Sequence, residues 1–129
     1  METEKIKSFH DLRVWKEAHS FVVLIYKNTK SFPKEELFGI TNQIRRAAVS
    51  ITSNIAEGFG RETLKDRIHF YVIALGSLNE TQNQLLVSRD VGYLKSDDWS
   101  KLEEQIIIIN KMLNGLIKKS RSYFVTLTS

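Results

Sequence analysis

Apolar residues recur at spacings of three and four along most of the chain, which is the period of one face of an α-helix. The alternation of apolar and polar residues that marks half-buried strands is missing. Four segments carry the helical period, at about 12–32, 41–57, 63–91 and 96–119. Because short connections join them, the pattern predicts an all-α fold, an antiparallel up-and-down four-helix bundle.

Local signals at the segment ends predict where each helix begins and ends. Asp11 is placed to cap the first helix, and Pro33 disfavours helical geometry in the residue before it. Gly58 suits the left-handed position that follows a helix and is expected to end the second one. Thr63 and Asp66 have the spacing of a capping box at the start of the third.

The chain is expected to form one domain over residues 1–129, with an ordered core at about 9–119 and a loosely docked tail at 120–129. The positions expected in the core are the apolar members of each helical stripe. They are Trp15, Ala18, Val22 and Ile25, then Ile44, Ala48, Ile51 and Ile55, then Leu64, Ile68, Tyr71, Val72, Leu75, Leu78, Leu85 and Leu86, and finally Leu102, Ile106, Ile109, Leu113 and Leu116.

Four consecutive isoleucines, Ile106–Ile109, span more than one helical turn and cannot all face one core. Ile107 and Ile108 therefore either lie at the edges of a wide core or form a second apolar face against another subunit. The first helix is also apolar on more than one side, where Phe21 and Val23 widen its stripe. We therefore favour self-association, with Phe21, Ile107 and Ile108 at the interface.

Composition narrows the class of protein. The chain has 129 residues, 42% hydrophobic and 26% charged, as in an ordinary globular domain. It contains no cysteine, which excludes disulfides and thiolate zinc sites. No apolar run is long enough to span a membrane and no signal peptide is recognisable, so we expect a cytoplasmic protein that does not bind membranes.

The positive charges, which exceed the negative ones by four, include two groups that could contact phosphate. Arg45 and Arg46 lie in the second helix, whereas Arg61, Lys65 and Arg67 surround its end and the start of the third. Since about three helical turns separate the two groups, we expect two subsites. The alternative is that the arginines form ion pairs, for example from Arg46 to Glu57 of a neighbouring helix or subunit.

Other chemistry has weaker support. His10, His19 and His69 lack the spacing of metal ligands, and Gly58–Gly60 lacks the third glycine of a dinucleotide-binding loop, so neither a metal nor a cofactor is expected. Arg13 and His19 could hold phosphate and transfer a proton in a ribonuclease. Their separation of six residues aligns them poorly on one helix face, and we expect no enzymatic activity.

Several strings of residues resemble a known family, the four-helix-bundle proteins encoded in intervening sequences of bacterial 23S ribosomal RNA genes. The matching strings are FHDLRVWKEAH (Phe9–His19), FPKEELFG (Phe32–Gly39), QIRRAAVSITSNIAEGFGR (Gln43–Arg61), ALGSLNE (Ala74–Glu80) and GYL (Gly92–Leu94).

The resemblance implies a four-helix bundle assembled as a ring-shaped homopentamer. It also implies kinship with the accessory variability protein of diversity-generating retroelements, a basic barrel that binds nucleic acid and a reverse transcriptase. Phe9, Trp15 and Phe38 would then be anchors, while Asn54 and Glu57 would hydrogen-bond inside the assembly.

The leading hypothesis is a non-enzymatic homo-oligomer that binds RNA or DNA without sequence preference through the two basic groups. The alternative is a protein-interaction scaffold, or an accessory factor of a reverse transcriptase, whose arginines bridge subunits. The weakest alternative is the ribonuclease built on Arg13 and His19.

Overall fold

The computed structural model describes residues 5–128, and the side chains of residues 5–123. This part of the chain contains four α-helices, two short 3-10 helices and no strand, which confirms the all-α prediction. In chain order they are η1 (Phe9–Asp11), α1 (Arg13–Thr29), η2 (Lys34–Glu36), α2 (Ile40–Phe59), α3 (Leu64–Asp90) and α4 (Ser96–Thr128).

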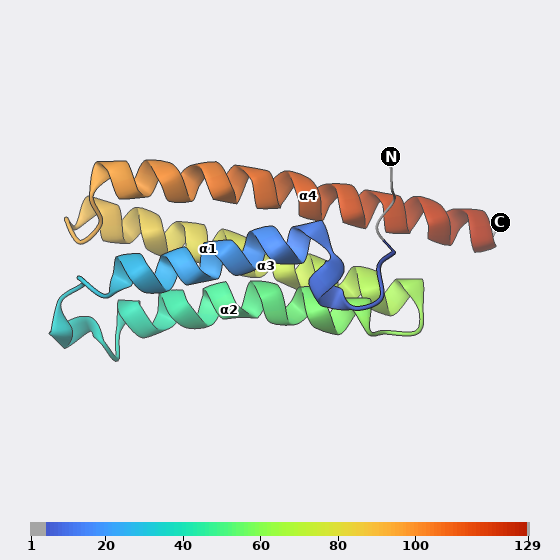
Figure 1. Ribbon diagram of the computed structural model, residues 1–129, viewed down its shortest axis with the longest axis horizontal. Coiled ribbons are helices and arrows are strands. Elements are labelled where there is room, and N and C mark those ends of the chain that lie inside the picture. Colours follow the sequence, from blue (N-terminus) through green and yellow to red (C-terminus); the bar gives the residue numbers. More distant parts are fainter. Residues whose placement is uncertain (1–4, 129) are drawn as a thin grey trace.

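The helices lie side by side along one long axis, and the chain turns back at each connection between them (Figure 1). α1 and α3 each pack beside both α2 and α4, while the Cα atoms of the two diagonal pairs stay more than 8 Å apart within the described residues. α4 is a single helix to Thr128 and extends beyond the end of the other three (Figure 1). It therefore includes residues 120–128, which the sequence pattern had assigned to a loosely docked tail.

The predicted stripe of α2 is confirmed, since Ile44, Ala48, Ile51 and Ile55 are all completely buried. Phe21 of α1 is also completely buried within its own bundle. It sits at the core spacing, four residues before Ile25, so its side chain points inward. The prediction that Phe21 forms part of an oligomer interface is therefore wrong.

The buried face of α3 differs from its predicted apolar stripe. Val72 was expected in the core but is exposed, whereas Thr81 and Ser88 are completely buried. The Thr81 hydroxyl donates a 2.8 Å hydrogen bond to the carbonyl of Ser77, and that of Ser88 a 2.9 Å bond to the carbonyl of Gln84. These bonds satisfy the hydroxyls inside the helix, so small polar residues can occupy core positions. The buried positions recur at spacings of three and four, at Tyr71, Ala74, Leu78, Thr81, Leu85 and Ser88.

Gly58 does not end α2 in a left-handed conformation, as the sequence had suggested. The helix continues to Phe59, and the only described residue with positive φ is Gly92, in the connection to α4. Gly58 is instead needed for space, because a β-carbon there would lie 2.7 Å from Cε1 of Tyr71. α2 and α3 thus approach each other closely at this end.

Asp11 caps the short helix η1, whereas the sequence pattern predicted that it would cap the first α-helix. Its carboxylate accepts hydrogen bonds from the backbone N–H groups of Lys7 (3.0 Å) and Ser8 (3.1 Å), so it stabilises η1 rather than α1. These two bonds favour the ionised form and lower the pKa of Asp11. At α3 one half of the predicted capping box is confirmed, since the Thr63 side chain accepts a 3.1 Å bond from the N–H of Asp66.

Candidate nucleic-acid interface

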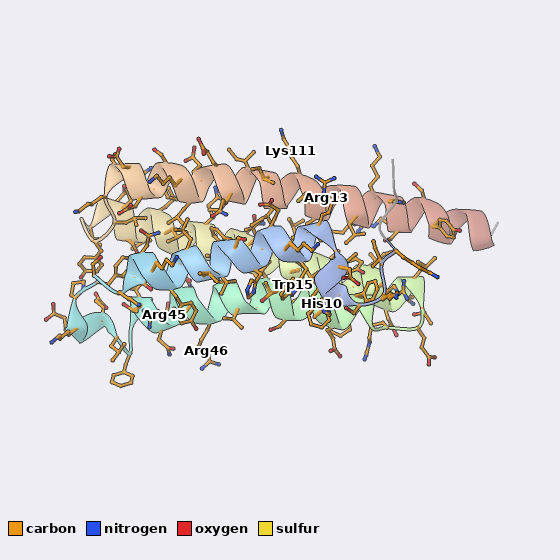
Figure 2. All side chains as sticks on the ribbon, viewed as in Figure 1. His10, Arg13, Trp15, Arg45, Arg46 and Lys111 are labelled. Atoms are coloured by element: carbon orange, nitrogen blue, oxygen red, sulfur yellow. The ribbon has the colours of Figure 1, made fainter. Side chains whose placement is uncertain are left out.

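The predicted basic residues lie at two separate places. Arg45 and Arg46 belong to the first half of α2, near its connection to α1 (Figure 2). Arg61 follows the end of α2, and Lys65 and Arg67 lie in the first turn of α3. The helical rise of about 1.5 Å per residue puts roughly 22 Å between Arg46 and Arg61 along the axis. Within one chain the residues form two subsites and no continuous patch.

Arg45 is held between α1 and α2. Its Nε donates a 2.9 Å hydrogen bond to the hydroxyl of Thr29, which in turn donates 2.8 Å to the carbonyl of Ile25. The guanidinium carbon lies 4.7 Å from the centre of the Tyr26 ring, in a cation–π contact. These contacts fix the orientation of the guanidinium and join the two helices.

Arg46 is exposed and forms no hydrogen bond or ion pair with any other described residue. The Glu57 carboxylate considered as its partner in a neighbouring helix or subunit instead lies 3.4 Å from Arg61. Arg46 borders two grooves, one on each side of α2. The groove toward α3 has a volume of about 250 Å³ and includes Glu80, whereas the groove toward α1 has about 460 Å³ and includes Tyr26.

The second subsite surrounds the connection from α2 to α3. The Arg61 guanidinium stacks over the Phe70 ring at 4.9 Å and pairs with Glu57, but both charged groups are largely exposed. Arg67 donates from Nε to the carbonyl of Arg61 at 2.8 Å, which stabilises the turn. Lys65 is exposed and has no hydrogen-bond or ion-pair partner in the described part of the chain. An ion pair as exposed as Arg61–Glu57 adds little to stability, so Arg61 and Lys65 remain open to an external anion.

The two residues of the possible ribonuclease site do not converge. The His19 ring stacks on Trp15 with 4.7 Å between ring centres, and Phe9 packs edge-on against Trp15 at 5.4 Å. Arg13 and Trp15 lie on opposite sides of α1 (Figure 2), so the Trp15–His19 stack faces away from Arg13. Arg13 is exposed and makes no hydrogen bond within the described residues.

Ile107 and Ile108 are 48% and 44% exposed on α4, so they face away from the core of their own bundle. α3 presents further exposed apolar residues: Val72, which had been expected in the core, and Ile73 and Val87, which the sequence pattern did not single out. Phe38 is almost fully exposed, so it does not act as an anchor within the part of the chain that the structure describes.

The sequence pattern did not identify Tyr26, which lies against Arg45. Tyr26 follows the core residue Ile25 and is therefore rotated about 100° away from the core, onto the flank of α1 that faces α2. The only sign of its role in the sequence was an aromatic residue one position outside the core stripe. Its position opposite Arg45, from a different helix, became visible only in the folded chain.

Among the side chains that the structure describes, no three histidine or carboxylate groups gather as a metal site would require. Within the same residues, no helix is both long and apolar enough to cross a membrane.

The model of the family described as 23S rRNA-intervening sequence protein matches residues 10–115. The chain belongs to this family. A crystal structure of a protein with unknown function from the S23 ribosomal protein family of Bacteroides thetaiotaomicron VPI-5482 is similar, with a TM-score of 0.76 and 29% sequence identity. The similarity covers 81% of this chain and 95% of that chain. No match was found among curated proteins.

The family match includes both basic subsites, α2 and α3 in full and α4 as far as residue 115. It therefore covers most of the part of the chain that forms the bundle. The description of the similar structure assigns no function to that protein, so the activity has to be argued from the residues of this chain.

Proposed function

We propose that this member of the 23S rRNA-intervening sequence family is a non-enzymatic nucleic-acid-binding protein. In this proposal the antiparallel bundle assembles into a ring-shaped homopentamer and contacts RNA or DNA without sequence preference. The contacts come from Arg45, Arg46, Arg61, Lys65 and Arg67.

The observation that carries the proposal is the shortage of acidic partners at these residues. Of the five cations, only Arg61 has an ion pair within the described residues, and that pair is exposed on both sides. Arginine offers forked donors that match two phosphate oxygens, and lysine offers a mobile point charge. A shortage of acidic partners around the cations of a net-positive protein favours an anionic polymer as the partner.

Assembly strengthens this interaction. One chain presents two small subsites roughly 22 Å apart along the bundle, too few contacts for tight binding. Repetition around a ring multiplies the contacts along one strand, and effective concentration makes weak phosphate sites additive. Oligomerisation and nucleic-acid binding are therefore parts of one proposal.

Titration of labelled RNA and DNA at several salt concentrations tests the proposal. Binding should weaken steeply with salt, and Arg61→Ala combined with Lys65→Ala should flatten the dependence of log K on log salt by roughly 1–2, since each phosphate contact contributes about 0.9. The matched control is Lys101→Ala with Lys111→Ala, two exposed cations of α4 outside both subsites. Absence of binding at low salt, or an equal change in the control, would contradict the proposal.

A protein-interaction scaffold, or an accessory factor of a reverse transcriptase, is the second candidate. It is favoured by the groove that Arg46 shares with Glu80 of α3, because an arginine and a carboxylate on one surface suit pairing between identical subunits. Under this alternative, Arg46→Ala lowers the mass in solution and the melting temperature and leaves nucleic-acid affinity unchanged. Under our proposal, the main effect of Arg46→Ala is a lower affinity for nucleic acid.

A ribonuclease built on Arg13 and His19 is the weakest candidate. The stacking of His19 on Trp15 gives this histidine a packing role that needs no substrate. Cleavage of labelled RNA that disappears in His19→Ala, with unchanged melting, is the result that would support catalysis over simple binding.

A further inference from the structure

The groove between α1 and α2 has the features of a site for an unstacked base. It has a volume of about 460 Å³ and is open to solvent. Tyr26 and Val49, on its two sides, are 40% and 38% exposed. The residues that line it are Tyr26, Arg45, Arg46, Val49, Ser50 and Ser53.

The charge of this groove is one-sided. Arg45 and Arg46 both line it, and no carboxylate does. Arg45 is held in place by Thr29 and by the ring of Tyr26, whereas Arg46 has no partner among the described residues. A fixed guanidinium beside a free one can contact successive phosphates of a backbone at little cost in side-chain ordering.

The remaining surface of the groove suits flat rings. Ser50 and Ser53 are the smallest residues of the lining, and they leave room for a planar group beside α2. The exposed Tyr26 ring and the guanidinium that covers it both belong to the kinds of surface on which nucleobases stack. A second aromatic surface, the Trp15–His19 stack, lies on the same flank of α1, because His19 and Tyr26 are seven residues apart.

We propose that the α1–α2 groove binds single-stranded nucleic acid, with a base packed on Tyr26 and the neighbouring phosphates on Arg45 and Arg46. A duplex keeps its bases stacked inside and offers Tyr26 no ring face, whereas a single strand offers one at each nucleotide. The inference rests on the proposed nucleic-acid function and specifies its substrate class and the residue that selects it.

The experiment compares labelled oligo-dT with a labelled duplex of the same length, at one salt concentration. Loss of a base–aromatic contact weakens binding by roughly tenfold or more. Tyr26→Leu, which keeps apolar bulk but removes the ring, should therefore weaken oligo-dT binding by about tenfold and leave duplex binding within about twofold. Tyr26→Phe, which keeps the ring, should retain affinity, as should Tyr123→Leu, the change of an exposed tyrosine on α4.

A reporter inside the groove covers the case in which Tyr26→Leu disturbs Arg45 and lowers the melting temperature. Val49→Trp places an indole on the exposed side of α2. Its added fluorescence, measured against the wild-type protein, should be quenched by oligo-dT and unaffected by the duplex.

Two outcomes would overturn the inference while leaving the proposed function standing. One is equal binding of oligo-dT and duplex that Arg46→Ala weakens and Tyr26→Leu does not. The other is a Val49→Trp signal that responds equally to both ligands. If Tyr26→Leu instead changes the mass in solution without changing affinity, the groove is a contact between copies of the chain and the inference is wrong.

Discussion

Gly58 allows the end of α2 to approach α3 more closely than any other amino acid would. A β-carbon at this position would lie 2.7 Å from Cε1 of Tyr71 and 3.1 Å from Cβ of Phe70, closer than such atoms pack. Tyr71 cannot move aside easily, since its side chain is buried, and this burial raises the pKa of its phenol. The glycine is thus required by a neighbouring helix and not by its own backbone conformation.

Gly58→Ala should therefore destabilise the protein by about 1–3 kcal/mol, the usual cost of overpacking a core, as measured by denaturant unfolding. Gly115→Ala is the matched control, because a β-carbon there meets nothing within 4 Å. Alanine should stabilise a helix interior at that position by up to about 1 kcal/mol. Stabilisation by both changes would mean that the close approach at Gly58 is not needed.

At the scale of elements, one hydrogen bond joins the two connections at the same end of the bundle. The Tyr93 hydroxyl donates 2.9 Å to the carboxylate of Glu36, linking the α3–α4 connection to η2. The Tyr93 ring also packs against Phe32, with 5.7 Å between ring centres. Because the bond requires the protonated phenol and the carboxylate opposes its ionisation, it raises the pKa of Tyr93.

The raised pKa predicts a loss of stability in alkaline solution. A group whose pKa is higher in the folded state stabilises the protein below its unfolded pKa, about 10 for tyrosine, and loses that effect as the pH rises through the folded pKa. Tyr93→Phe should melt at a lower temperature than wild type from pH 7 to 9, and the difference should shrink above about pH 10. Tyr123→Phe, at an exposed tyrosine of α4, is the control and should show no such pH dependence. A constant difference at all pH values would exclude a contribution from the Tyr93–Glu36 bond.

At the scale of the whole molecule, α3 and α4 carry apolar residues on their outer faces that the core of one bundle does not bury. Ile107 and Ile108 are adjacent on α4, and Ile73 and Val87 are exposed on α3. Exposed apolar side chains next to each other on one helix are a feature of protein–protein contacts, so we propose that Ile107 and Ile108 pack against another protein surface. A second copy of the chain is the partner that we expect.

Ile107→Gln with Ile108→Gln should remove most of the assembled mass and shift the protein toward the 14.9 kDa of one chain, as read by light scattering during size-exclusion chromatography. Helical content should be unchanged, since both side chains point away from the core. Val91→Gln, at an exposed valine between α3 and α4, is the control and should leave the mass unchanged. An unchanged mass in the double variant would place the interface elsewhere.

Periodicity in the amino-acid sequence was sufficient to predict four helices, the core stripe of α2 and the outward orientation of Ile107 and Ile108. These features are local, because the position of a residue on a helix depends only on its distance in sequence from its neighbours. The cap at Thr63 was predictable for the same reason, since both of its partners lie within one turn.

The folded chain decided what depends on residues far apart in sequence. The Cβ space at Gly58 is set by Tyr71 on the next helix, and Arg45 is oriented by Thr29 and Tyr26 from the helix before. The core role of Thr81 also emerged only in the bundle, where its hydroxyl bonds within its own helix and the residue is completely buried. Helical periodicity specifies which way a side chain points, whereas the packing of the helices determines which residues it meets. Contacts between helices therefore decide the close approach at Gly58. They also decide the geometry of the groove beside Arg45.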